Sequence, residues 1–125
     1  MRHGMIGLGV ALLLAPSALA APALAADAQH GKQLFQACAA CHGQNGTGGT
    51  LGPDLTGVVG RKAGTLDNFR YSNAMQHSNL VWTEANLRAY VSNPQAEVKG
   101  NRMPFSGVKN PKDADDIVAY LKTLK

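Results

Sequence analysis

The sequence predicts a small all-α domain with long loops, and three observations support this fold class. Apolar residues recur every three or four positions in segments that begin at good helix-capping residues. No segment shows the alternation of apolar and polar residues that is typical of a strand. Stretches rich in glycine and proline separate the helical segments. A chain of 125 residues has room for one such domain.

Residues 1–25 are predicted to be a secretory signal peptide rather than part of the fold. Arg2 precedes an uncharged apolar stretch, and two Ala-Leu-Ala tripeptides of the kind found at cleavage sites end at Ala20 and Ala25. We expect cleavage near Ala25, which leaves residues 26–125 as the mature domain.

The alternative for this segment is an uncleaved membrane anchor. Residues 4–26 carry no charge and are long enough to span a bilayer. However, Pro16, Ser17 and Pro22 interrupt the second half, so the uninterrupted apolar stretch is too short to span. Export to the periplasm is therefore expected, and it excludes cytosolic enzymes and intracellular nucleic-acid binding.

The mature domain has few large apolar side chains. Only 19 of residues 26–125 are Leu, Ile, Val or Phe, close to the level of about 20% below which highly charged chains tend to be disordered. The net charge is low, with 11 basic and 8 acidic residues, so disorder is not indicated. We expect something besides side chains to fill the centre of the domain.

The first predicted helix runs from Asp27, a good N-cap, to about His42. Residues 43–52 contain five glycines and predict an exposed loop, which continues to Gly64. The last predicted helix begins at Asn110, followed by a proline at the first helical position. Its apolar face comprises Ala114, Ile117, Leu121 and Leu124.

Two shorter helices are predicted between these. Ser72 caps the first of them, which extends to about His77, and Thr83 caps the second. The second helix ends near Asn93, because the following proline disfavours helical geometry at that residue. Residues 95–110 are predicted to be an extended loop.

Both cysteines of the chain lie in Cys38-Ala39-Ala40-Cys41-His42, the C-x-x-C-H pattern of covalent c-type haem attachment. Positions three and four apart share one face of a helix, so both thiols can reach one edge of a porphyrin. The histidine that follows can then bind the iron. One covalently bound haem c is the predicted cofactor.

Three other interpretations of the two cysteines compete with haem attachment. A disulfide would close a very small loop and stabilise little. A thioredoxin-like redox pair normally follows a strand, and none is predicted here. A zinc site would use Cys38, Cys41 and His42, with His30 or His77 as the fourth ligand.

Met103 is the predicted second axial ligand of the iron. It lies in a loop between turn residues, where a core-filling methionine would be unusual, whereas Met75 lies in a predicted helix. A thioether favours ferrous iron and raises the reduction potential relative to a second imidazole. With His42 and Met103 both bound, the iron offers no position to a substrate. This predicts a one-electron carrier rather than an enzyme, and no catalytic residues.

The mature chain resembles the mitochondrial-type class I c-type cytochromes, including their soluble bacterial members. Beyond the haem motif, the resemblance rests on elements that occur in the same order along the chain. These elements are Gly31, Phe35, Gly52-Pro53-Asp54-Leu55, Gly60-Arg61-Lys62, Phe69, Tyr71, Trp82, Tyr90, Asn93-Pro94, Met103, Phe105 and residues 116–121.

The resemblance implies the class I cytochrome c fold, in which the first and last helices cross and short helices and long loops surround a covalent haem. It implies that Gly31 permits the crossing and that the Pro53 carbonyl accepts the second N–H of His42. It also implies haem contacts for six further side chains. Arg61, Tyr71 and Trp82 would bind the inner propionate, Tyr90 would hydrogen-bond the Met103 sulfur, Asn101 would donate a hydrogen bond, and Phe105 would cover the exposed haem edge.

The chain departs from the family before Met103. Lys99 and Asn101 stand where the family often has proline and threonine, so we expect a less rigid loop and a methionine ligand that is labile at high pH. Met75 replaces a polar residue near the haem, which alters the hydrogen-bond network there.

The resulting prediction is a periplasmic electron carrier, monomeric, that docks transiently on respiratory or photosynthetic membrane complexes or on periplasmic dehydrogenases and oxidases. The alternative is a haem enzyme or sensor that binds peroxide or a gas when Met103 detaches. Six basic residues either form a docking face around the haem edge or belong to an ordinary solvated surface. They are Lys32, Lys62, Lys99, Arg102, Lys109 and Lys112.

Overall fold

The computed structural model describes residues 4, 7, 9–17 and 25–125. Residues 1–3, 5–6, 8 and 18–24 of the predicted signal peptide lie outside the described residues. Both Ala-Leu-Ala tripeptides fall in this part, except for Ala25. The described residues 9–17 form neither helix nor strand. No helix in the described part of the chain combines the length and the hydropathy that a membrane crossing requires.

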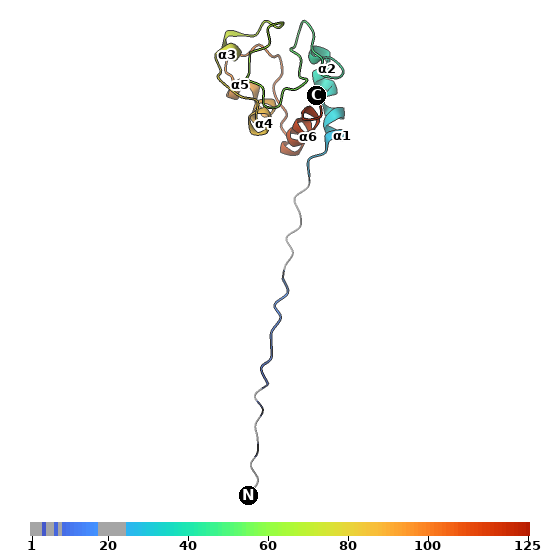
Figure 1. Cartoon of the computed structure of the whole chain (residues 1–125), viewed down its shortest axis with the longest axis vertical. Helices are drawn as coiled ribbons and strands as arrows, with labels where there is room; N and C mark the ends of the chain where they lie inside the picture. The colour runs from blue at the N-terminus through green and yellow to red at the C-terminus, as the bar shows by residue number, and fades with distance from the viewer. Residues whose placement is uncertain (1–3, 5–6, 8, 18–24) are drawn as a thin grey trace.

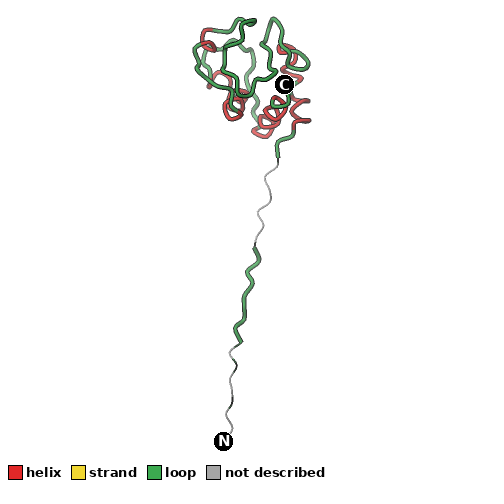
Figure 2. Tube along the Cα trace, in the orientation of Figure 1, coloured by secondary structure: helices red, strands yellow, loops and turns green. Residues whose placement is uncertain are grey.

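Residues 25–125 form a helical domain in which loops account for much of the chain (Figures 1 and 2). The helices are α1 (Ala28–Leu34), α2 (Gln36–His42), α3 (Asn73–Gln76), α4 (Glu84–Ser92), α5 (Pro94–Glu97) and α6 (Pro111–Leu121). Among the described residues there is no strand, only an isolated antiparallel bridge between Lys62 and Val81. The predicted all-α fold class is confirmed.

Capping side chains start the helices where the sequence predicts them. The Asp27 carboxylate accepts the N–H groups of residues 29 and 30 at the start of α1. Ser72 and Thr83 each accept an N–H three residues later, at 3.1 Å. Asn110 accepts the Lys112 N–H at 2.9 Å at the start of α6. Each cap satisfies N–H groups that the first helical turn leaves without a partner.

The predicted single helix from Asp27 to His42 is instead two helices that meet at Phe35. The carbonyl of Phe35 accepts the Cys38 N–H at 2.8 Å, an i to i+3 bond that tightens the chain locally. The Phe35 ring is only 1% exposed and packs on Tyr120, with ring centroids 5.0 Å apart. Burial of this ring therefore accompanies the break between α1 and α2.

The prediction of an extended loop over residues 95–110 is wrong at its start. Pro94 does end α4, but it also occupies the first position of α5, where its missing N–H costs nothing. Asn93 caps this short helix by accepting the Ala96 N–H at 3.3 Å. At the other end of the chain, α6 stops at Leu121, so Leu124 lies beyond the helix that was predicted to include it.

Helices α1 and α6 cross in close contact (Figure 1). A Cβ atom on Gly31 would overlap the Asp116 carbonyl oxygen and would lie 3.0 Å from the Tyr120 Cβ. Only glycine allows the two backbones to approach this far. The crossing agrees with the family resemblance.

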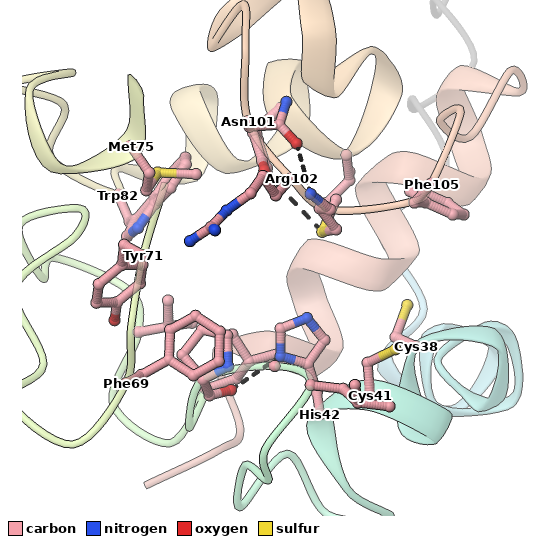
Figure 3. A pocket seen from close by; sticks show the side chains of 18 of the residues that line it. Cys38, Cys41, His42, Phe69, Tyr71, Met75, Trp82, Asn101, Arg102 and Phe105 are labelled. Atoms are coloured by element: carbon pink, nitrogen blue, oxygen red, sulfur yellow. Dashed lines mark hydrogen bonds between the residues drawn. The ribbon is translucent and has the colours of Figure 1, made fainter. Parts of the chain in front are cut away.

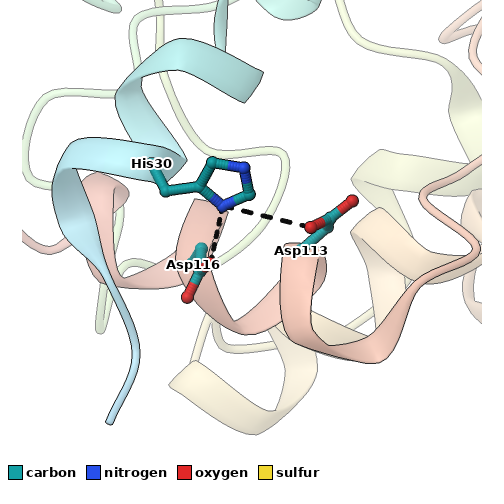
Figure 4. Close-up of side chains that lie close together, drawn as sticks. All are labelled: His30, Asp113 and Asp116. Atoms are coloured by element: carbon teal, nitrogen blue, oxygen red, sulfur yellow. Dashed lines mark hydrogen bonds and ion pairs between the residues drawn. The ribbon is translucent and has the colours of Figure 1, made fainter. Parts of the chain in front are cut away.

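A buried carboxylate fastens the two helices at the crossing. The Asp116 side chain, 2% exposed, accepts the Asp27 N–H at 2.7 Å and the Lys112 ammonium at 2.5 Å. His30 Nδ1 lies 2.7 Å from the other carboxylate oxygen, with Asp113 nearby at 4.0 Å (Figure 4). These bonds, the Asp27 N–H first among them, hold the pKa of Asp116 well below its usual range.

We predict that Asp116→Asn lowers stability at pH 7 by about 1–3 kcal/mol, because it removes charge-assisted hydrogen bonds from a buried position. The depressed pKa means that the carboxylate stabilises the fold above its unfolded pKa of about 3.9. That contribution is lost as the pH falls below this value. Denaturant titrations of the two proteins should therefore differ at pH 7 and converge as the solution is acidified.

Asp115→Asn is the matched control on the same helix. The Asp115 carboxylate is 41% exposed and pairs with the Arg88 guanidinium at 3.3 Å, so its loss should cost about 1 kcal/mol at most. Equal destabilisation by the two substitutions at pH 7 would contradict the role assigned to Asp116.

Candidate cofactor site

The centre of the domain contains a cavity of about 450 Å³. This volume is in the range of small-molecule and cofactor sites, about 300–1,000 Å³. Apolar side chains from the helices and loops form most of its wall. They include Phe35, Leu55, Val58, Met75, Leu87, Ile117 and Leu121. The expectation that side chains alone do not fill the domain is confirmed.

His42, at the end of α2, forms one side of the cavity (Figure 3). Its Nδ1 lies 2.8 Å from the Pro53 carbonyl, which can only accept, so Nδ1 carries a proton. Burial lowers the pKa of His42 despite this hydrogen bond, which favours the neutral ring. The neutral tautomer leaves Nε2 without a proton and free to bind a metal.

Gly52 allows the following proline to reach His42. A Cβ atom on Gly52 would lie 2.9 Å from both His42 Nδ1 and the Cys41 carbonyl oxygen. Such contacts are too short for a side chain, so the loop could not lie this close to α2 with any other residue. Gly52 is among the residues that carry the family resemblance, but its role beside His42 was not predicted from the sequence.

Cys38 and Cys41 are free, half-buried thiols on α2, and both line the cavity (Figure 3). Burial raises the pKa of Cys38, and the neighbouring Cys41 raises it further. The two residues form no disulfide. The imidazoles proposed as a fourth zinc ligand are engaged elsewhere, since His30 contacts Asp116 and His77 contacts the Asn73 carbonyl.

Met103 lines the same cavity, and two neighbours hold it in place. Its backbone N–H donates to the Asn101 side-chain oxygen at 2.9 Å. The Tyr90 hydroxyl donates to its sulfur at 4.0 Å. Burial raises the pKa of Tyr90 to about 12, so the hydroxyl keeps its proton at neutral pH.

Met75, the rival methionine, also lines the cavity but lies within α3 and is 9% exposed. Figure 3 shows it beside Tyr71 and Trp82, at the opposite end from Cys38 and Cys41. No described side chain donates a hydrogen bond to its sulfur, unlike that of Met103.

Three polar side chains predicted to bind a haem propionate also line the cavity, namely Arg61, Tyr71 and Trp82. The Arg61 guanidinium donates to the Asp54 carbonyl at 2.6 Å and to the Thr56 carbonyl at 3.3 Å. Burial raises the pKa of Tyr71. The indole N–H of Trp82 has no hydrogen-bond partner among the described residues, although the side chain is buried.

The remaining predicted contacts, Asn101 and Phe105, come from the segment around Met103. Asn101 is buried and uses one amide hydrogen to bond the Val98 carbonyl at 2.9 Å. Phe105 is half-buried and lies on the side of the cavity nearest the cysteines (Figure 3). The structure thus brings all eleven predicted site residues to one cavity or its wall.

Other cavity residues were not predicted as binding residues. Leu51 is 73% exposed at the cavity, and Arg70 and Arg102 are also exposed there. Arg102 donates to the Arg70 carbonyl at 3.3 Å, and Figure 3 shows its guanidinium directed across the cavity. Of the six basic residues considered for docking, only Arg102 lines the cavity.

These residues fit a covalently bound haem. The cavity is largely apolar, two thiols lie at one edge, and an imidazole nitrogen and a thioether sulfur are available as metal ligands. Polar donors stand at the opposite end, where carboxylates would need them.

Comparison with known proteins supports the same interpretation. A family model described as "Cytochrome c" matches residues 28–125. The chain is 41% identical to "Cytochrome c2" of Blastochloris viridis over 107 residues, covering 85% of this chain and 84% of the relative. It is 44% identical to "Cytochrome c2" of Rhodomicrobium vannielii over 116 residues, covering 92% and 90%. The solved structure of "cytochrome cH from Methylobacterium extorquens" superposes with a TM-score of 0.70 at 41% identity, covering 78% of this chain and 98% of that chain.

We predict that Gly52→Ala weakens the site, because the added Cβ must displace the His42 ring or the Cys41 carbonyl. The haem-loaded variant should lose about 1–3 kcal/mol of unfolding free energy, the usual cost of overpacking. Its low-spin absorption spectrum should also be less complete than that of the wild type.

Gly49→Ala serves as the control for this substitution. Its Cβ would lie at an ordinary 3.6 Å from the same Cys41 carbonyl, and like Gly52 it does not adopt a positive φ. Equal effects in denaturant titrations of the two variants would refute the steric argument.

Proposed function

This chain belongs to the cytochrome c family, and from that premise we propose that it is a periplasmic one-electron carrier whose haem iron lies between His42 and Met103. Haem c, attached through Cys38 and Cys41, is the cofactor of this family. The observation that carries the proposal is the presence of an unprotonated imidazole nitrogen and a hydrogen-bonded thioether in one cavity.

When bound, haem supplies a couple in which iron cycles between Fe(II) and Fe(III). The chain holds both ligands through neighbouring groups: the Pro53 carbonyl orients the His42 ring, and Asn101 and Tyr90 hold Met103. A hydrogen bond from Tyr90 withdraws electron density from the sulfur, which tunes how strongly the thioether favours ferrous iron.

We propose that Arg61, Tyr71, Trp82 and Asn101 supply donors to the propionates. Their exposure to the cavity and the unused Trp82 N–H support this role. A carboxylate in such surroundings needs partners, because an unpaired charge in an apolar interior is costly. Phe105 would cover the haem at the edge near the cysteines, where electrons leave.

The proposal includes the absence of enzymatic activity. If both axial positions are occupied by side chains, a substrate or gas finds no open position on the iron. Family membership agrees with electron transfer as the function, and no observation on this chain favours the peroxidase-like or gas-binding alternative.

We propose further that residues 1–25 direct export and are removed, leaving residues 26–125 as a monomeric carrier. Transient docking on membrane redox complexes or periplasmic dehydrogenases and oxidases suits this role. Exposed Arg70 and Arg102 at the cavity support an acidic docking surface on such partners.

Replacement of the proposed sulfur ligand tests the function directly. We predict that Met103→His lowers the reduction potential by on the order of 0.1–0.3 V, within the range of about 0.8 V that axial ligands span. The reason is that imidazole stabilises ferric iron more than a thioether does. A potentiometric titration followed by absorption gives the value.

Met75→Leu is the control, since it conserves volume in the same cavity and should shift the potential far less. A large shift in potential for the Met75 variant, with none for the Met103 variant, would show that Met75 and not Met103 is the sulfur ligand.

The export proposal predicts the mass of the purified protein. Haem-loaded protein recovered from the periplasmic fraction should begin at Ala26 and carry one haem through two thioether bonds. Intact-mass spectrometry and N-terminal sequencing check this. Protein that retains residues 1–25 in the membrane fraction would instead support an uncleaved anchor.

A further inference from the structure

The side chain of Gln95 binds the backbone just before Met103 at two points. Its Oε1 accepts the Gly100 N–H at 3.1 Å, and its Nε2 donates to the Asn101 carbonyl at 3.0 Å. One amide therefore satisfies a donor and an acceptor on consecutive residues. This arrangement fixes the distance and the orientation of the segment before Met103, at Gly100 and Asn101, relative to α5.

Helix α5, which carries Gln95, is anchored in the domain by buried residues at both of its ends. Pro94, the preceding residue, is among the most deeply buried residues of the domain, at under 2% exposure. Val98, at the end of α5, is 4% exposed. Gln95 itself is exposed, and its side chain reaches from this helix to the exposed Gly100 and the buried Asn101.

Hydrogen bonds of the Asn101 side chain connect this residue to the backbone of Met103. The Asn101 side chain donates to the Val98 carbonyl at 2.9 Å and accepts the Met103 N–H at 2.9 Å. Holding Asn101 in place therefore holds the backbone of Met103. The Gln95 amide and the Asn101 amide together form a continuous path of hydrogen bonds from α5 to the methionine.

The segment is otherwise held by few backbone hydrogen bonds. The Asn101 N–H donates to the Val98 carbonyl at 3.0 Å, the Phe105 N–H to the Met103 carbonyl at 2.8 Å and the Val108 N–H to the Val91 carbonyl at 2.8 Å. Residues 99–110 form no helix or strand, and Gly100 adopts φ +91°, a conformation that glycine reaches with unusual freedom. Lys99 is exposed and makes no side-chain hydrogen bond among the described residues. The proline expected here by family resemblance would have restricted this backbone directly.

We propose that Gln95 is a positioning residue that keeps Met103 on the iron. The inference rests on the proposed His42–Met103 ligation and adds a residue that does not line the cavity. An external ligand binds only in molecules whose methionine is detached, so its apparent affinity scales with the detached fraction. Removal of two hydrogen bonds from the segment raises that fraction.

The test compares imidazole binding to ferric, haem-loaded wild type and Gln95→Ala by absorption titration. Net hydrogen-bond energies at exposed positions predict an apparent Kd about 3–10-fold lower for the variant. The far-red charge-transfer band of thioether-bound ferric haem should disappear at correspondingly lower imidazole. Amide hydrogen exchange at Gly100, which does not depend on any added ligand, should be faster in the variant.

Two further variants sharpen the comparison. Gln95→Glu keeps an acceptor for the Gly100 N–H but sets a carboxylate oxygen against the Asn101 carbonyl, so imidazole affinity should rise at least as much as for Gln95→Ala. Glu97→Ala changes an exposed side chain of the same helix that makes no hydrogen bond with described residues, and it should behave as wild type.

The outcomes separate this inference from the proposed function. If the wild type shows the thioether band and Gln95→Ala binds imidazole no more tightly, the positioning role is overturned and the ligation stands. An effect of Glu97→Ala as large as that of Gln95→Ala also overturns it, because the cause would then be α5 in general. A wild type without the band overturns both.

Discussion

The buried side chains of the domain pack around a cavity, and this constraint explains how its parts are arranged. Few large apolar residues are available, and 10 of the 19 Leu, Ile, Val and Phe residues in 26–125 line a space of about 450 Å³. Burial of apolar surface therefore has to be completed by the haem. Covering that surface stabilises the loops between helices, which account for much of the wall.

Local signals in the sequence were sufficient for the start of the first helix and for the helices capped by Ser72, Thr83 and Asn110. Ser72, Thr83 and Asn110 act through N–H groups two or three residues away, so the relevant interaction lies within one turn. The break at Phe35 was missed because burial of the Phe35 ring against Tyr120 is a tertiary contact, which the neighbouring sequence does not encode. Helix α5 was missed although Asn93-Pro94 repeats the Asn-Pro signal at the start of α6, because a helix of 4 residues is too short to show an apolar repeat.

Some residues of the candidate site could likewise be predicted from the sequence, and others could not. The haem motif has a spacing with a direct chemical meaning, and Met103 was inferred from its place in a loop between turn residues. The resemblance supplied Pro53 and Tyr90 as their partners. The role of Gly52 could have been suspected, because a glycine directly precedes the proline that reaches His42. No comparable signal marks Gln95, whose two bonds depend on a short helix that the sequence did not predict.

The hydrogen bonds that hold the segment before Met103 compensate for one departure from the family, the absence of a proline at Lys99. A proline restricts a loop through the backbone itself, whereas Gln95 and Asn101 restrict it through side-chain amides. The loss of the proline frees the backbone of this segment, and the hydrogen bonds of Gln95 and Asn101 restrict it again. The lability of the methionine at high pH stays a prediction.

The half-buried state of Cys38 has a consequence for the order of events during biosynthesis. The thiolate is the reactive form of cysteine, and burial in the folded domain raises the pKa of this thiol, so a smaller fraction of it is ionised. The same sulfur in an open chain ionises more readily and is accessible from all sides. Packing of α2 therefore lowers both the ionised fraction and the accessibility of Cys38, so thioether formation is easier while this helix is unpacked.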